Sequence, residues 1–245
     1  MFTEKDNFKS QYHRAIIVSD DIYPQSIQKL ESLGIKVFWS HENPSVSKPL
    51  SKHADMQIVK ISDKTYICAP ECYEYYKNIF KNFFCNLICG NTYLSSNYPC
   101  DIAYNIVVGE KYAVHNFKYT DSIVKENLSN KTLIDVSQGY CACSICALPN
   151  NSFISSDAGV IKALADYDVS FLQISQENIL LPGFDYGFFG GASFMIGDNT
   201  LAINGDIRTH PDFNAITEFC AKQNINVISL STDKIMDIGS AIFIA

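Results

Sequence analysis

The stretch HADMQIVKISDKTY (residues 53–66) decides the fold, because three further stretches of fourteen residues can be laid over it. They are PCDIAYNIVVGEKY (99–112), YCACSICALPNNSF (140–153) and FFGGASFMIGDNTL (188–201). Each begins with small or polar residues, continues as an apolar run, reaches a two-residue turn and enters a second apolar run. Two apolar runs around a short Gly, Asn or Asp turn are typical of a β-hairpin. The chain therefore repeats a unit that starts with a hairpin.

The segments that follow each hairpin recur as well. A polar breaker leads into a stretch with helical spacing, clearest in GVIKALADYD (159–168) and PDFNAITEFCAKQN (211–224). A third short strand is then predicted at 86–90, 131–137, 169–175 and 225–231. The unit is ββαβ, and its starts at 53, 99, 140 and 188 are 46, 41 and 48 residues apart.

The two ends of the chain supply a fifth unit. Residues 14–40 have its second strand, helix and third strand, and DIGSAIFIA (237–245) has its first strand. Joining them closes a ring and removes exposed sheet edges, as in propellers. We therefore predict one α/β domain over 1–245, a five-module pseudo-fivefold α/β propeller. Its modules are 53–98, 99–139, 140–187, 188–236, and 237–245 joined with 14–41. The alternative, an α+β sandwich with coincidental spacing, does not explain why five units agree in element order.

Composition narrows the classes of partner. Nineteen basic and 26 acidic residues give a net charge of −7, and no run of Lys and Arg offsets it, which argues against nucleic-acid binding. No eighteen apolar residues run together, and the first thirteen residues are polar, so neither a membrane span nor a signal peptide is expected. Nine cysteines, an odd number, favour reduced thiols in the cytoplasm over a disulfide framework.

Alternation along the first strand of each unit predicts which side chains meet. Residues two apart on a strand share a face, and one face of these strands is smaller and more polar, as in strands that line an axial channel. On that face lie His53, Asp55, Asp101, Asn105, Ser144 and Cys146. Two carboxylates at one mouth would suit a cation, and a guanidinium can bind them through bidentate hydrogen bonds.

Each of these residues also has a purely structural interpretation. His53 would be a satisfied strand-edge histidine, and Asp55 and Asp101 would mark strand entry or cap a turn. Cys146 would be a small buried hydrophobe, whereas a nucleophile needs a lowered pKa and a nearby base. Cys141 and Cys143 point away from Cys146 on a strand, so the three thiols cannot share a tetrahedral ion. We expect no metal and no cofactor.

The glycine-rich segment LPGFDYGFFGG (181–191) carries four aromatic rings. Asp185 and Tyr186 would form a rim or lid over the channel, because apolar rings on an open loop lower solubility unless something packs on them. The alternative is a tight connection between modules, which glycines also permit.

Five ββαβ modules closed by the termini resemble the pentein, or guanidino-group-modifying, fold. Arginine and agmatine deiminases, dimethylarginine hydrolases, amidinotransferases and a non-enzymatic translation initiation factor share that fold. His53-Ala54-Asp55 resembles the His-x-Asp motif of the deiminases, which implies a His acid/base and an Asp that grips the guanidinium.

The C-terminal segment departs from those enzymes. Residues 239–243 resemble their Gly-Ser-x-His-Cys segment, but Ile242 and Phe243 stand where the His and the nucleophilic Cys would be. The motifs HADM, YNIVVGEKYAVHN and GFDYGFFGG look more like a bacterial branch of the fold that lacks this Cys than like the enzymes named above.

Two functions follow. The first is a cysteine-dependent hydrolase or deiminase of guanidino or amidino compounds, with His53 as acid/base and Cys146 as nucleophile. Its expected ligand contacts are Asp55, Asp101, Asn105, Ser144, Asp185, Tyr186 and Ser240. The second is a non-catalytic binding protein on the same scaffold, its terminal nucleophile lost at Phe243. For both functions we expect a small cationic ligand. The sequence does not determine the substrate or the oligomeric state.

Overall fold

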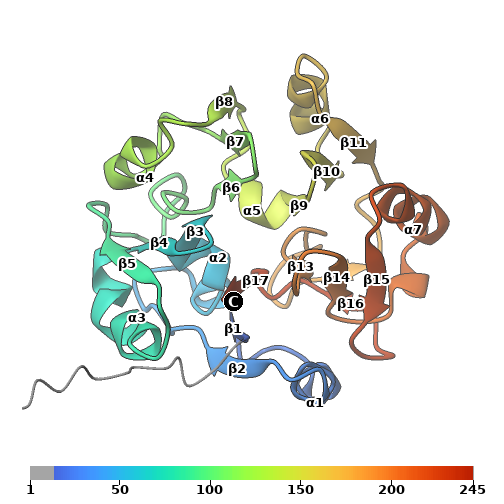
Figure 1. Ribbon diagram of the computed structural model, residues 1–245, viewed down its shortest axis with the longest axis horizontal. Coiled ribbons are helices and arrows are strands. Elements are labelled where there is room, and N and C mark those ends of the chain that lie inside the picture. The colour runs from blue at the N-terminus through green and yellow to red at the C-terminus, as the bar shows by residue number, and fades with distance from the viewer. Residues whose placement is uncertain (1–13, 245) are drawn as a thin grey trace, which may run out of the picture.

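The computed structural model describes residues 14–244, and five small sheets stand around a common centre with helices outside them (Figure 1). The polar segment 1–13, which bears on the expected absence of a signal peptide, lies outside the described residues. Each sheet has three strands, in the orders β17-β1-β2, β3-β4-β5, β6-β7-β8, β9-β10-β11 and β13-β14-β15. This arrangement confirms the predicted five-module ring.

The strands are short, as the repeat requires. Those of the split module are β1 (Ala15–Val18), β2 (Lys36–Trp39) and β17 (Ala241–Ile244). The next two modules contain β3 (Ile58–Ser62), β4 (Thr65–Cys68), β5 (Asn86–Cys89), β6 (Val107–Val108), β7 (Tyr112–His115) and β8 (Thr132–Asp135). The last two contain β9 (Ile145–Leu148), β10 (Ser152–Ser155), β11 (Ser170–Gln173), β13 (Ser193–Met195), β14 (Thr200–Ile203) and β15 (Asn226–Ser229).

Each module pairs its first two strands antiparallel and its second and third strands parallel. The parallel pair needs a crossover, which the helices provide. The longer helices are α1 (Pro24–Ser32), α3 (Tyr73–Phe80), α4 (Ser122–Glu126), α6 (Ala158–Leu164) and α7 (Phe213–Lys222). Three short 3₁₀ turns also occur: η1 (Lys48–Leu50), η2 (Pro70–Cys72) and η3 (Ile207–Thr209). The middle strands β1, β7 and β10 are buried throughout, because a strand lies on each side of them.

The termini close the ring as predicted. β1 and β17 run antiparallel, with Ile16 opposite Phe243 and Ile17 opposite Ile242. The predicted Asn150-Asn151 turn joins β9 and β10, and both residues have φ near +55°, at 58° and 52°. Asparagine tolerates that left-handed conformation better than most residues, so the turn chemistry and the hairpin agree.

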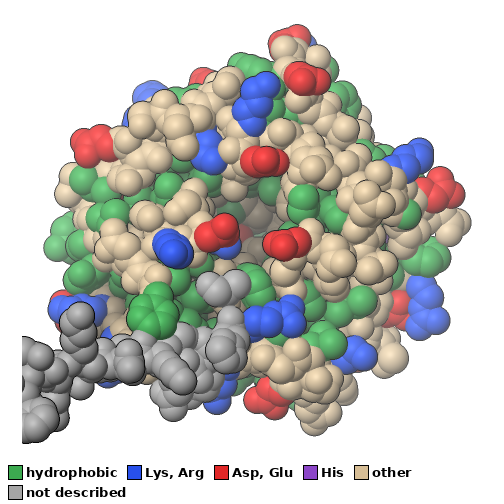
Figure 2. All heavy atoms as spheres, in the orientation of Figure 1, with side chains coloured by type: hydrophobic (Ala, Val, Ile, Leu, Met, Phe, Trp, Pro, Cys, Tyr) green, Lys and Arg blue, Asp and Glu red, His purple; other side chains and the backbone are tan. Residues whose placement is uncertain are grey.

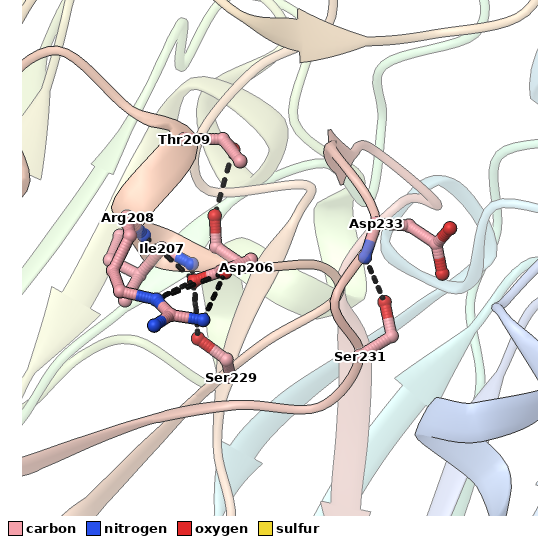
Figure 3. Close-up of polar contacts among 7 residues, drawn as sticks. All are labelled: Asp206, Ile207, Arg208, Thr209, Ser229, Ser231 and Asp233. Carbon is pink, nitrogen blue, oxygen red and sulfur yellow. Dashed lines mark hydrogen bonds and ion pairs between the residues drawn. The ribbon is translucent and has the colours of Figure 1, made fainter.

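Aspartates start three of the crossover segments: Asp157 and Asp206 belong to the expected polar breakers Ser156-Asp157 and Gly205-Asp206, and Asp121 follows the expected breaker His115-Asn116. Asp121 and Asp157 accept hydrogen bonds from the first free N–H groups of α4 and α6. Asp206 does the same for η3 through the Arg208 N–H, and its carboxylate also binds the Arg208 guanidinium (Figure 3). Because such caps satisfy backbone donors that no helical bond reaches, these residues fix where each crossover begins.

The start of the hairpins differs from the prediction. Residues expected to be extended form single helical turns instead: α2 (Ala54–Gln57) and α5 (Cys141–Ser144). Extended backbone begins only at β3 and β9, and the alternation used to assign faces therefore does not hold across these turns. A further two-stranded sheet, β12 (Ile179–Leu180) with β16 (Ile235–Met236), was not predicted.

No helix among residues 14–244 has both the length and the apolar character that crossing a bilayer requires.

Candidate active site

A histidine, a carboxylate and a thiol converge near the centre of the ring. His53 precedes α2, Asp55 lies in its first turn, and Cys143 lies in α5 of another module. One donor atom from each lies within 4.8 Å of the other two. All three side chains are buried, with exposures of 2%, 3% and 3%. The two short helical turns therefore bring together groups that are ninety residues apart in sequence.

A second buried carboxylate, that of Asp237, adjoins this group. It accepts hydrogen bonds from the backbone N–H groups of Phe188 (2.8 Å) and Gly239 (2.9 Å). A Cβ on Gly191 would lie 2.0 Å from its Oδ1, and a Cβ on Gly239 would lie 2.2 Å from the His53 Cβ. Only glycine permits both approaches, and Gly239 also has a φ of +71°.

Burial sets the charge state of the site. It raises the pKa of Asp55 to about 7, with a further rise from the nearby charge of Asp237. It raises the pKa of Asp237 to about 6 and lowers that of His53 to about 3. Among the described residues no Lys or Arg forms an ion pair with either carboxylate. The site is therefore a buried pair of acids beside a neutral imidazole, and a cation could stabilise their charged forms.

Asn105 positions the Cys143 thiol by hydrogen bonds to both the backbone of α5 and the sulfur. Its Oδ1 accepts hydrogen bonds from the N–H groups of Ala142 (2.8 Å) and Cys143 (3.3 Å), and its Nδ2 lies 3.1 Å from the Cys143 Sγ. The Cys143 thiol in turn donates to the Asp55 Oδ2 at 3.1 Å. Burial, with Asp55 and Asp237 nearby, raises the pKa of Cys143 well above its usual value, so the unliganded site holds a protonated thiol.

Two polar atoms of the cluster have no partner. Neither the His53 Nδ1 nor the Asp55 Oδ1 makes a hydrogen bond with any described residue. Buried polar atoms are nearly always paired, because leaving one unpaired costs about 1–3 kcal/mol. This protein leaves two such atoms unpaired, which is typical of a site whose hydrogen bonds are completed by a ligand.

The cluster opens into a cavity of about 390 Å³. It is lined by Leu50, His53, Tyr140, Cys143, Leu181, Phe184, Asp185, Tyr186, Phe188 and Asp237. Tyr140 donates its phenolic hydrogen to Asp101 Oδ2 at 2.7 Å, so Asp101 lies behind the wall and orients it. Asp185 and Tyr186 reach the cavity from an exposed loop, while Gly190 and Gly191 of the same segment pack against the Cys143 carbonyl and Asp237. Asp185 and Tyr186 thus lie where a rim would, while residues 190–191 make the contacts of a tight connection between modules.

A second cavity, of about 480 Å³, is lined by residues from all five modules. Cys146, Ser240 and Phe243 line it, and so does Asp55, whereas His53, Cys143 and Asp237 line the first cavity. Burial raises the pKa of Cys146 to about 12, and its side chain packs in a hydrophobic cluster with Leu148 and Ile154. The face in Figure 2 is hollowed near the centre of the ring, with acidic and basic side chains at the edge of the hollow.

The structure thus brings His53, Asp55 and Asn105 together as predicted, but with Cys143 as the thiol. Cys146 and Ser240 lie at the other cavity, and Ser144 is buried, its hydroxyl directed to the Cys141 carbonyl (3.4 Å). Cys143 was assigned to the opposite face because the helical turn α5 was not foreseen. The sequence pattern places Asp237 in a strand and does not select it as a site residue. The available signal is its position two residues before Gly239, where the segment that resembles Gly-Ser-x-His-Cys begins.

The donor set also suits a metal. An imidazole nitrogen, a thiolate and a carboxylate are the ligands that Zn²⁺ takes in proteins. The expectation of no metal rests on the geometry of Cys141, Cys143 and Cys146 alone. The set that converges in the structure is a different one: His53, Asp55 and Cys143.

Comparisons with known proteins agree with the ring. A family model described as "Family of unknown function (DUF6873)" matches residues 17–242. No curated protein sequence matches significantly.

Among solved structures, DDAH from Pseudomonas aeruginosa in complex with citrulline superposes with a TM-score of 0.55 at 9% identity, covering 89% of this chain and 92% of that one. C. jejuni agmatine deiminase gives 0.56 at 11% identity, covering 91% and 88%. SxtG, an amidinotransferase from Microseira wollei in saxitoxin biosynthesis, gives 0.51 at 11% identity, covering 89% and 88%. These likenesses show the pentein fold that the module order and motifs predicted.

Proposed function

This chain belongs to the family of unknown function DUF6873, and we propose that it binds a small guanidino or amidino cation beside Cys143 and hydrolyses it. The observation that carries the proposal is the pair of buried carboxylates, Asp55 and Asp237, without a cationic partner among the described residues. A bound amidinium would supply the missing charge and offer N–H donors to the unpaired Asp55 Oδ1.

The chemistry needs a thiol, a proton acceptor and a second acid/base. The Cys143 sulfur attacks the central carbon of the amidinium and forms a C–S bond, while its proton passes to Asp55, 3.1 Å away, and on to the departing nitrogen. The C–N bond breaks and ammonia or an amine leaves. Water then adds to the same carbon, His53 takes a proton from it, and the C–S bond breaks. The product carries C=O where the substrate carried C=N, the thiol is restored, and the released proton is taken up by the ammonia.

The bound cation helps to activate the thiol. Without a ligand, burial holds the Cys143 pKa high, and the two nearby carboxylates raise it further. An amidinium between them cancels their negative charge and favours the thiolate. The substrate itself thereby lowers the barrier to attack.

A charge-matched pair of reagents tests the cation site. 2-Chloroacetamidine carries the cation, whereas 2-chloroacetamide has nearly the same shape and no charge. The exposed Cys89 and Cys100 serve as internal references for intrinsic reactivity. We divide the alkylation rate of Cys143 by that of Cys89 and Cys100 for each reagent. We expect this ratio to be about tenfold or more larger for the amidine than for the amide, equivalent to about 1.4 kcal/mol. Asp55→Asn should abolish the preference; equal normalised rates in the wild-type chain would refute a cation site.

The alternative function for this scaffold, binding without catalysis, is favoured by Phe243 at the position of the terminal thiol. Release of ammonia or amine from guanidino compounds separates the two. We propose turnover that Cys143→Ala abolishes and Cys146→Ala leaves intact. Binding without turnover in the wild-type chain would select the non-catalytic function.

A further inference from the structure

The wall of the 390 Å³ cavity is apolar. Six of its side chains carry aliphatic groups or phenyl and phenol rings: Leu50, Tyr140, Leu181, Phe184, Tyr186 and Phe188. Phe184 and Tyr186 are half exposed, at 50% and 51%, and the Tyr186 ring meets Phe188 edge-on at 5.8 Å. Large rings left open to solvent at a cavity mouth indicate contact with a ligand. The ligand therefore extends an apolar segment from the buried acids toward the mouth.

The charges along this path have one sign. Asp237 lies at the buried end and Asp185 on the exposed loop at the mouth, and none of the described residues that line the cavity is Lys or Arg. A carboxylate on the ligand would find no counter-ion there and would face Asp185. A second cationic group at that end would be attracted to the same carboxylate and to the faces of the aromatic rings.

From this lining we infer that the ligand is a guanidino- or amidino-alkylamine without a carboxylate, held by its amidinium at Asp237, beside Asp55, and by its amine near Asp185. The inference rests on the proposed function and specifies its substrate class. It separates this site from one built for amino acids, which would need a cation to hold the α-carboxylate.

Three compounds of one chain length isolate the two ends. Agmatine has the guanidinium and the amine, butylguanidine lacks the amine, and arginine adds a carboxylate. Calorimetry on the Cys143→Ser chain measures binding without turnover. We expect agmatine to bind at least about tenfold more tightly than arginine, because the arginine carboxylate would have no counter-ion and would be repelled by Asp185.

The variant Asp185→Asn tests the mouth. Because exposed ion pairs contribute little, it should weaken agmatine by about threefold and leave butylguanidine unchanged. Asp198→Asn is the matched control, since Asp198 is also exposed but lines the other cavity. Arginine within about threefold of agmatine would overturn the inference while the cation site stands. The inference would also be overturned if Asp185→Asn and Asp198→Asn weakened agmatine binding equally, or if neither variant weakened it. If none of the three compounds binds, the proposed function fails and the inference with it.

Discussion

At the scale of the residue, the site is held in a state that folding alone does not favour. Asp55 and Asp237 are buried close enough to repel each other, and His53 and Asp55 each keep a polar atom unpaired. A residue selected only for stability would be apolar or paired in such a place. These unpaired groups are the reason for proposing a ligand at this cluster.

Replacing Asp55 should stabilise the protein at high pH. The folded chain holds the Asp55 proton up to about pH 7, whereas the unfolded chain releases it near its ordinary pKa of 3.8, so this group's contribution to stability is lost as pH rises between those values. Asp55→Asn does not titrate. Urea unfolding should therefore show a gain on the order of 4 kcal/mol near pH 8 and little near pH 4. Asp63→Asn is the control: its side chain is 95% exposed and pairs with Lys60 at the surface, so it should change stability by about 1 kcal/mol or less. A gain confined to low pH would contradict the assignment.

Ligand affinity should rise with pH for the same reason. A cation binds the ionised carboxylates, whose pKa values are about 6 and about 7, while His53 stays neutral above its pKa of about 3. Calorimetry with agmatine from about pH 5 to pH 8 should show affinity that increases through this range and then levels off. An affinity that falls as pH rises would mean that the ligand binds the protonated acids.

At the scale of the element, two single-turn helices build the site. α2 carries Asp55 and α5 carries Cys143, and each lies just before the first strand of its module. The N–H of Asp55 bonds the Gly239 carbonyl at 3.1 Å, so α2 is tied to the segment before β17. Asn105 ties α5 to the module before it. The turns are positioned by their neighbours rather than by their own four residues, which are too few for a stable helix.

Asn105→Ala tests the link between Asn105 and α5. The substitution removes the side-chain acceptor of the buried Cys143 N–H and of the Ala142 N–H, which keeps a bond to the Asn105 carbonyl (3.3 Å), so we expect a cost of about 1–3 kcal/mol in unfolding free energy. It should also reduce the preference of Cys143 for the cationic reagent, because the sulfur loses its Nδ2 contact. Asn127→Ala, which removes one partly buried bond to a helix carbonyl, should cost about 1 kcal/mol or less. If both variants lowered the unfolding free energy equally, the hydrogen bonds of Asn105 would contribute no more than a partly exposed one.

At the scale of the whole molecule, ring closure by β1 and β17 positions the central residues. Gly239 and Asp237 directly precede β17, so pairing of Ile17 with Ile242 holds the last module against His53. The order of the modules along the chain matters less than the closed ring, since each module contributes the same elements.

A circular permutant tests this. Joining Ile244 to Ala15 by a short Asn-Gly turn, with new termini between Asn150 and Asn151, keeps every strand pair of the ring. We expect a cooperative thermal transition within about 10 °C of the parent, which corresponds to a loss of about 2–4 kcal/mol at this size. A chain ending at Ser240 lacks β17 and should lose that transition. Equal behaviour of the two chains would show that closure is dispensable.

The sequence determined the fold nearly completely. Hairpin turns at Asp63-Lys64 and Asn150-Asn151, and third strands such as 86–90, lie where the periodicity placed them, because strand alternation and turn chemistry are local properties. The pairing of the two ends followed from counting half-units.

The site depended on the tertiary structure. His53, Asp55 and Asn105 were predicted to meet, but Cys143 in place of Cys146, and Asp237 beside them, were not. Four residues such as Cys141–Ser144 carry no signal that separates a helical turn from a strand, and the choice comes from Asn105 and the Gly190-Gly191 approach, contacts made by other modules. A local pattern can fix which elements form, whereas the direction of a side chain at the hub is decided by the neighbours that pack against it.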